Sequence, residues 1–280
     1  MQNGYRLIKY SELPEAFRDE IAAEINLRSV SLLMKAAGSE WIQIGSGTLI
    51  FYGGLAGVLT AGHVVDELRK AQRIGFNVSH RTHCLNCPSE IVSFASNYKK
   101  ESGQDLPDLG FVTLPRQVVT QIEVKEKAFY NLKKRGSRPV EAVEHLHDGA
   151  WAIWGSPGEL TRFEPARLPD GKLEVHQCQT SFCTLQAVDD YPECDALSTT
   201  VDYSNCYGDL PQSFGGYSGG GVWHVAISQD NDGQWIIGDC TLAGVVCRQS
   251  EPRGHERDLI CNGPESMLSF LRSLAESSGG

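Results

Sequence analysis

Short runs of β-branched and aromatic residues, separated by glycine-containing turns, fill most of the chain from residue 29 to residue 115. They include SVSLLMK (29–35), EWIQIGSGTLIFY (40–52) and GVLTAGHVV (57–65). Similar runs return after residue 149 in AWAIWGSPG, GGGVWHVAI and QWIIGDCTLAGVVCR. Strands and turns at this regular spacing predict an all-β fold of the barrel or sandwich type.

The spacing of apolar residues changes at both ends of the chain. Within residues 13–26 and again within residues 263–278, apolar positions recur at helical intervals, which predicts a helix in each segment. Residues 116–148 are more polar and have no clean period, as is typical of a linker with some helix. The predicted organisation is an N-terminal helical extension (1–27), a first β-lobe (28–115), a linker (116–148) and a second β-lobe with the end helix (149–280).

Charge and cysteine content narrow the classes of function. The 280-residue chain carries 25 Lys and Arg against 35 Asp and Glu, a net charge of −10, which does not favour binding to nucleic acid. The start lacks the pattern of a secretory signal, and no window approaches the roughly 18 apolar residues needed to span a bilayer. We therefore expect a cytoplasmic protein without a membrane partner, whose nine cysteines are thiols or metal ligands.

Three stretches carry candidate chemistry. His63 ends an apolar run and follows the small residues Thr60, Ala61 and Gly62. Asp108 precedes the apolar run 109–114, where a buried carboxylate needs a partner. The third stretch, SFGGYSGGGVW (213–223), surrounds a serine with glycines.

Each stretch also has a simpler interpretation when it is taken alone. A single histidine is most often a strand-end residue with a satisfied hydrogen bond, and a glycine-rich segment is often a flexible surface loop. Together, the three residues fit nucleophilic catalysis. Ser218 would attack a carbonyl carbon, His63 would accept its proton, and Asp108 would hold the imidazole in the required tautomer.

Several motifs around these residues resemble those of the chymotrypsin/trypsin superfamily of serine peptidases, especially bacterial trypsin-like and HtrA-type protease domains. The matching segments are GSGTLI (45–50), TAGH (60–63), DLGFV (108–112) and GYSGG (216–220), with weaker matches in AIWGSPG (152–158) and LAGVVC (242–247). The resemblance spans about residues 28 to 276. It implies two antiparallel β-barrels with the triad in the cleft between them and the C-terminal helix packed on the second barrel, to which the helical spacing of residues 13–26 adds an N-terminal helix. It also implies an oxyanion hole formed by the backbone N–H groups of Gly216 and Ser218.

The sequence departs from the family pattern beside the nucleophile. Tyr217 stands where the digestive enzymes have an aspartate, so activation by an ion pair to a new N-terminus is not expected. Gly221 replaces the usual proline, and the resulting glycine run predicts a mobile loop and a partly latent enzyme that is ordered by substrate or by an activating protein partner.

The substrate pocket is harder to read from the sequence. By alignment it includes Gln212 at its base and Cys247, Arg248 and Gln249 along the cleft strand. No acidic group falls at the base, so a preference for Lys or Arg in the substrate is not expected. Arg248 or Arg257 would favour an acidic or polar side chain instead.

A second candidate site lies in SHRTHCLNCP (79–88). His80, His83, Cys84 and Cys87 have a spacing that fits a structural zinc site, although two thiols and exposed imidazoles in a loop explain the same pattern. The remaining cysteines are interpreted as small buried apolar residues.

These features favour a serine endopeptidase that needs no cofactor for catalysis and cuts protein or peptide substrates through an acyl-enzyme. An unselective peptidase would damage its own cell, so we expect narrow specificity or regulated activity, for example in a bacterial stress or defence pathway. Two alternatives remain open: a non-catalytic, protease-like module that binds peptides, and a scaffold organised around a metal ion.

Overall fold

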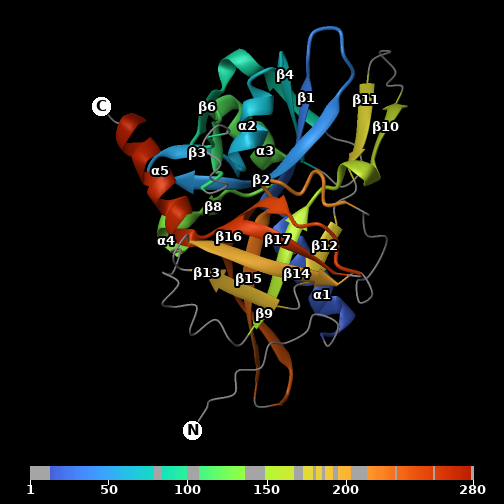
Figure 1. Cartoon of the computed structure of the whole chain (residues 1–280), viewed down its shortest axis with the longest axis vertical. Helices are drawn as coiled ribbons and strands as arrows, with labels where there is room; N and C mark the ends of the chain where they lie inside the picture. The colour runs from blue at the N-terminus through green and yellow to red at the C-terminus, as the bar shows by residue number, and fades with distance from the viewer. Residues whose placement is uncertain are drawn as a thin grey trace.

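The computed structural model describes residues 13–78, 84–99, 107–135, 149–166, 173–178, 181–184, 187–191, 195–202, 213–230, 232–254 and 256–278. Two large antiparallel sheets dominate this part of the chain, one above the other in Figure 1, with helices around them. The fold is mostly β, as the strand pattern predicts. None of the helices in the described ranges is both long and apolar enough to cross a membrane.

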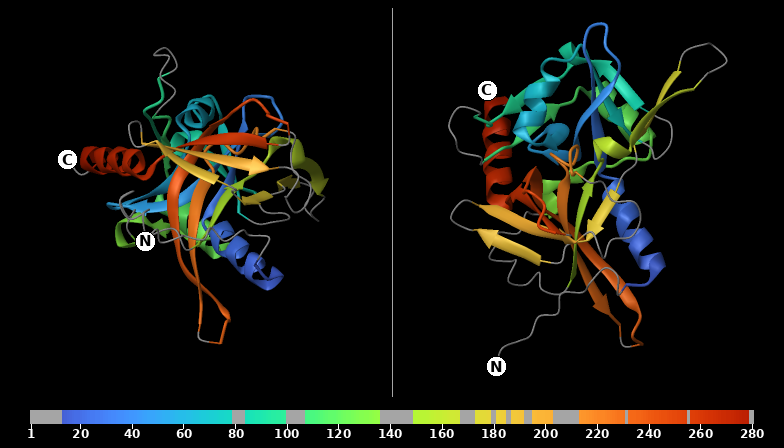
Figure 2. Two further views of the ribbon diagram at one scale, coloured as in Figure 1. Left: turned by 60° about the horizontal axis from the view of Figure 1, so that its bottom comes forward. Right: turned by 45° about the vertical axis from the view of Figure 1, so that its right-hand side comes forward.

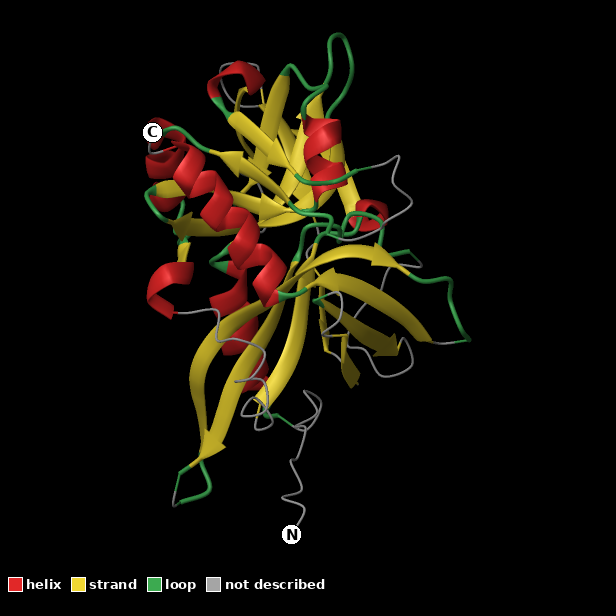
Figure 3. Cartoon of the chain, turned by 60° about the vertical axis from the view of Figure 1, so that its left-hand side comes forward, coloured by secondary structure: helices red, strands yellow, loops and turns green. Residues whose placement is uncertain are grey.

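The first sheet curls into a half-barrel around its own apolar core (Figure 3). Its strand order is β5-β4-β1-β2-β3-β7-β6, and β8 adds a short parallel pairing to β2. The helix α2 (Gly62–Leu68) follows β3, and α3 (Arg116–Val124) follows β7. The strands are β1 (Ser29–Lys35), β2 (Ile42–Tyr52), β3 (Leu55–Thr60), β4 (Arg73–Asn77), β5 (Cys84–Pro88), β6 (Ser93–Ser96), β7 (Gly110–Thr113) and β8 (Tyr130–Asn131), with a 3₁₀ turn at Ser89–Ile91.

The second sheet has the order β12-β9-β15-β16-β17-β14-β13. Its strands β15 and β16 form a long hairpin that extends away from the first sheet (Figures 1 and 2). The strands are β9 (Gly149–Gly155), β12 (Ser181–Thr184), β13 (Ala187–Tyr191), β14 (Ala196–Asp202), β15 (Gly221–Gln229), β16 (Trp235–Gln249) and β17 (Glu256–Asn262). A 3₁₀ turn at Gly158–Leu160 leads into a separate two-stranded sheet, β10 (Thr161–Ala166) and β11 (Leu173–Cys178).

Two closed barrels are not confirmed. Among the described strands, no pairing joins the two edge strands of either large sheet. The observed arrangement is a curled half-barrel and a second sheet, which is compatible with a chymotrypsin-like fold.

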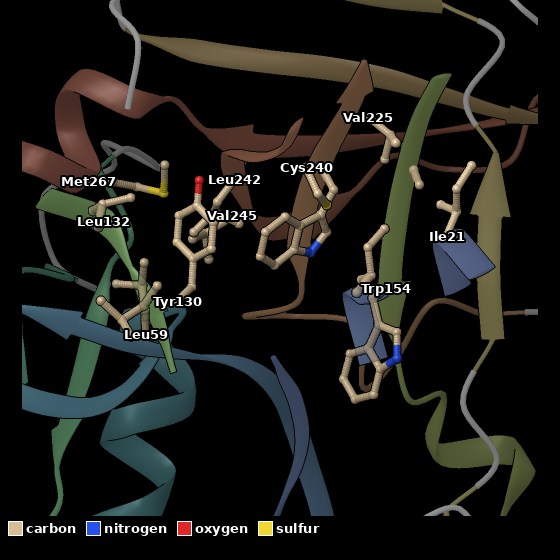
Figure 4. Close-up of a cluster of buried hydrophobic side chains, with 14 of the residues drawn as sticks. Ile21, Leu59, Tyr130, Leu132, Trp154, Val225, Cys240, Leu242, Val245 and Met267 are labelled. Carbon is tan, nitrogen blue, oxygen red and sulfur yellow. The ribbon is translucent and has the colours of Figure 1, made fainter. Parts of the chain in front are cut away.

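A shared core lies between the two sheets and includes residues of both terminal helices (Figure 4). The helix α1 (Glu15–Asn26) contributes Ile21, and α5 (Pro264–Ser278) contributes Met267. At the centre, the rings of Tyr130 and Trp223 meet edge to face with centroids 5.3 Å apart. Such packing ties the two sheets together and fixes how the loops between them meet.

The segment predicted as a linker supplies part of this core. It contains α3, β8 and α4 (Leu132–Arg135); Tyr130 and Leu132 are buried in the shared core, and Ile122 is buried in the half-barrel core. Its short elements carry too few apolar residues each to show a period, so the sequence pattern hides them.

Lys127, in the same segment, holds the end of α1. Its Nζ donates hydrogen bonds to the carbonyl oxygens of Asn26, at 2.6 Å, and Ser29, at 2.8 Å. A cation at a helix C-terminus is favourable, but burial lowers the pKa of Lys127 to about 8.

Candidate active site

His63 is the second residue of α2 and lies directly behind the end of β3. The chain turns sharply between β3 and α2, and the small residues Ala61 and Gly62 leave room for this turn. A Cβ atom on Gly62 would lie 2.8 Å from Ser96 Oγ and 2.9 Å from Asp108 Oδ1. Glycine at this position therefore lets the start of α2 approach the carboxylate closely.

Both carboxylate oxygens of Asp108 bind His63. Oδ2 lies 2.6 Å from the ring Nδ1, and Oδ1 accepts a 3.0 Å hydrogen bond from the backbone N–H of His63. An ionised carboxylate only accepts hydrogen bonds, so Nδ1 is the donor in this pair, and in the neutral ring Nε2 is the nitrogen that can accept a proton. The side chain of Asp108 is 6% exposed and that of His63 is 36% exposed, so the histidine forms the accessible side of the pair.

The backbone of Asp108 is held by Asn262, at the end of β17. Asn262 Oδ1 accepts a 2.8 Å hydrogen bond from Asp108 N, and Asn262 Nδ2 donates a 2.9 Å hydrogen bond to Asp108 O. Asn262 is 1% exposed. It ties the aspartate of the first sheet to the second sheet, and no sequence motif pointed to this residue.

Ser218 lies in the turn 213–220, immediately before β15. Ser46 of β2 binds this turn at two places. Its N–H donates to Ser218 O at 2.8 Å, and its Oγ donates to Gly216 O at 2.7 Å. Ser46 O in turn accepts a 2.7 Å hydrogen bond from Thr60 Oγ1, three residues before His63. The serine turn of one sheet therefore rests on the strands that lead to the histidine of the other.

Two backbone amides of this turn have fixed orientations and no hydrogen-bond partner among the described residues. Gly158 N donates to Gly215 O at 2.8 Å, and Gly220 N donates to Tyr217 O at 2.7 Å. In a planar trans peptide the next N–H points opposite to the carbonyl, so these bonds also orient the amides of Gly216 and Ser218. Neither amide donates a hydrogen bond in the described part of the chain. The two amides that the resemblance implies for an oxyanion hole are thus unpaired.

The glycines of the turn allow close packing. A Cβ atom on Gly219 would lie 1.9 Å from Thr60 Oγ1, and one on Gly220 would lie 2.1 Å from Trp154 O. Gly216 and Gly219 also have φ values of +100° and +87°, which side chains rarely tolerate. The glycine run predicts a mobile loop from the sequence. In the structure, the same glycines lie in a turn that contacts both sheets.

Tyr217 is completely buried beneath the turn. Its ring packs closely against Gly155, because a Cβ atom on that glycine would lie 2.3 Å from Tyr217 Cδ1. The ring also meets that of Phe214 edge to face, with centroids 4.8 Å apart. The turn is therefore supported by an aromatic contact at the position where the digestive enzymes use an ion pair.

Ser218 and His63 are not hydrogen-bonded to each other in this structure. Among the described residues, no hydrogen bond joins Ser218 Oγ to His63. Of the predicted triad, His63 and Asp108 form a hydrogen-bonded pair, and the turn that carries Ser218 is linked to the strand before His63 through Ser46 and Thr60.

The predicted substrate pocket is described in part. Gln212 lies outside the described residues. Cys247 is buried, with Sγ 3.0 Å from Ile260 O, and burial together with the charge of Asp108 raises its pKa to about 12. Arg248 is exposed, whereas the Gln249 side chain accepts a 2.9 Å hydrogen bond from Phe214 N.

The predicted zinc residues do not gather in the described part. His80 and His83 lie outside it. Cys84 and Cys87 are three residues apart on β5, so they face opposite sides of the sheet. Cys87 enters the half-barrel core, and burial raises its pKa to about 11, while Cys84 packs near Leu33. No group of three metal-binding side chains occurs among the residues that the structure describes.

Comparison with known proteins does not assign a family. No family model matches the chain, and neither does any curated protein. A solved structure titled "Aromatic interactions drive the coupled folding and binding of the intrinsically disordered Sesbania mosaic virus VPg protein" is similar over 95% of this chain and 93% of that chain, with 12% identity and a TM-score of 0.41.

Proposed function

We propose that this protein is a serine endopeptidase of the chymotrypsin type, with His63, Asp108 and Ser218 as its catalytic triad. The observation that carries the proposal is the His63–Asp108 pair, in which both carboxylate oxygens orient one histidine. The amides of Gly216 and Ser218, which donate no hydrogen bond among the described residues, support the same chemistry.

In the proposed reaction, His63 Nε2 accepts the proton of Ser218 Oγ as this oxygen bonds to the carbonyl carbon of the substrate. The oxyanion is stabilised by the N–H groups of Gly216 and Ser218, where loss of one donor typically costs about 10²–10³ in rate. Asp108 stabilises the imidazolium. His63 then protonates the leaving amine, and water hydrolyses the acyl-enzyme by the same steps.

The test is covalent labelling by a fluorophosphonate, followed by intact mass. The wild-type protein should gain one adduct, and Ser218→Ala should gain none, because the probe reacts with a serine activated by its base. Ser273→Ala is the matched control, since this serine lies exposed on α5, and it should label as the wild type does. Equal labelling of wild type and Ser218→Ala would refute the proposal.

One observation favours a second candidate, a protease-like module that binds peptides without cutting them. Ser218 Oγ makes no hydrogen bond to His63. In enzymes without substrate this contact is often long and tightens only in the complex, so it does not exclude catalysis. Adduct formation separates the two candidates, because a binding module has no need of an activated serine.

A further inference from the structure

Arg257 is a buried cation that has no acidic partner among the described residues. It lies on β17, is 8% exposed, and makes one hydrogen bond in the described part of the chain, from Nη1 to Gln249 Oε1 at 2.5 Å. Its Nε is fully buried and has no partner. Charged groups in protein interiors are normally paired, because desolvation otherwise destabilises the fold. A guanidinium without an acidic partner in the described part of the chain therefore suits an anion supplied from outside.

The position of Arg257 links it to the serine turn. Gln249 Oε1, which binds Arg257, also accepts the N–H of Phe214 at 2.9 Å. Gln249 Nε2 donates to Ser213 Oγ at 3.1 Å. Arg257 is thus two hydrogen bonds away from the backbone of the turn, four residues before Ser218.

The edge of the guanidinium that makes no hydrogen bond to the described residues defines the chemistry of the ligand. Gln249 occupies Nη1, which leaves Nε and Nη2 without hydrogen-bond partners among the described residues. These two N–H groups point the same way and form a fork that matches the two oxygens of a carboxylate. A neutral amide offers one acceptor and one donor, so it fits this fork less well.

We propose that Arg257 is the specificity-determining residue of the site and binds the side-chain carboxylate of an aspartate or glutamate whose carbonyl Ser218 attacks. The catalytic part of this inference rests on the proposed function. The acidic side chain would replace the missing counter-ion, while the attacked carbonyl lies at the amides of Gly216 and Ser218.

The experiment compares peptidyl diphenyl phosphonates that carry glutamate, glutamine or lysine in the position next to phosphorus. Glutamate and glutamine differ in charge and not in size, so their ratio isolates the carboxylate. On the wild type, the glutamate probe should label Ser218 about 10- to 100-fold faster than the glutamine probe, the range expected for charged hydrogen bonds. Arg257→Gln should abolish this preference, and Arg257→Lys should retain part of it.

Arg253→Gln is the matched control. Arg253 lies between β16 and β17, is exposed, and already pairs with Asp258. This variant loses the same charge and should keep the glutamate preference. If Arg257→Gln fails to fold, Arg257→Lys is measured instead, and it should show a smaller preference for the glutamate probe than the wild type does.

A second measurement separates this inference from the proposed function. Binding of a peptide aldehyde ending in glutamate, or of its glutamine analogue, is measured by calorimetry on Ser218→Ala. Fluorophosphonate labelling without a glutamate preference would overturn the role of Arg257 and leave the peptidase proposal standing. Arg257-dependent binding of the glutamate peptide without labelling would support the acidic subsite and overturn the peptidase proposal. If the protein shows neither labelling nor Arg257-dependent binding of the glutamate peptide, both the peptidase proposal and the role of Arg257 are overturned.

Discussion

Asn262 gives the sharpest test of how the site is held together. Replacing it by alanine removes both hydrogen bonds to the backbone of Asp108, at 2.8 and 2.9 Å. The N–H and C=O of Asp108 then stay buried without partners. Each unsatisfied group costs about 1–3 kcal/mol, so the free energy of unfolding should fall by about 2–5 kcal/mol.

The same change should affect the chemistry, because Asp108 is free to shift from His63. Asn262 is a positioning residue, and we expect Asn262→Ala to slow labelling of Ser218 about 10- to 100-fold in protein that remains folded. The pH dependence of labelling should also change, since a displaced carboxylate stabilises the imidazolium less well. Loss of fold stability alone would leave this pH profile unchanged.

Urea denaturation followed by tryptophan fluorescence measures the stability, and intact mass measures the labelling rate at several pH values. Asn77→Ala is the matched control, because Asn77 is also buried but its Oδ1 has no partner to lose. It should leave labelling unchanged. An Asn262→Ala protein with wild-type labelling at every pH and an unfolding free energy within about 0.5 kcal/mol of the wild type would refute the reasoning.

Three further predictions concern the pair, the turn and the buried lysine. Asp108→Asn should reduce the Ser218 labelling rate by about 10³–10⁴ at neutral pH, since an amide no longer enforces the His63 tautomer; a smaller effect than tenfold would contradict the pairing. Gly219→Ala should abolish labelling and lower the unfolding free energy by at least about 2 kcal/mol, because its Cβ would lie 1.9 Å from Thr60 Oγ1 at a positive φ; unchanged denaturation would contradict the packing. Lys127 has a pKa lowered from 10.5 to about 8, so between these pH values the unfolded state binds more protons and the lysine adds stability as pH rises, by about 3 kcal/mol. The difference in unfolding free energy between wild type and Lys127→Met, measured at pH 8 and pH 10.5, should change by about this amount, and a constant difference would refute the shift.

Sequence pattern predicts the local parts of the site. Strand and turn spacing place His63 at the end of a strand and Asp108 at the head of another, as β3 and β7 show. The small residue Gly62 indicates a crowded approach, and the structure identifies Asp108 Oδ1 and Ser96 as the atoms behind it. Such features depend on neighbours in the chain, which the pattern records.

Contacts between distant segments cannot be predicted from the spacing of apolar residues along the sequence. Ser46 binds Gly216 from 170 residues away, and Asn262 binds Asp108 from 154 residues away. A buried serine or asparagine gives no signal of its own, because its role depends on which backbone group the fold places opposite. On β5 the spacing of Cys84 and Cys87 in the sequence does not reveal that an extended strand directs the two side chains to opposite faces.

One strand joins the two halves of the proposed site. On β17, Arg257 and Cys261 are both buried and lie four positions apart, so they point to the same face of the sheet. Asn262 follows at the end of the strand, where it reaches Asp108 across the interface between the sheets. Arg257 reaches the serine turn through Gln249 at the other end. The orientation of the base and the proposed recognition of an acidic side chain therefore depend on the register of a single strand. A shift of β17 by one residue would remove both contacts at once.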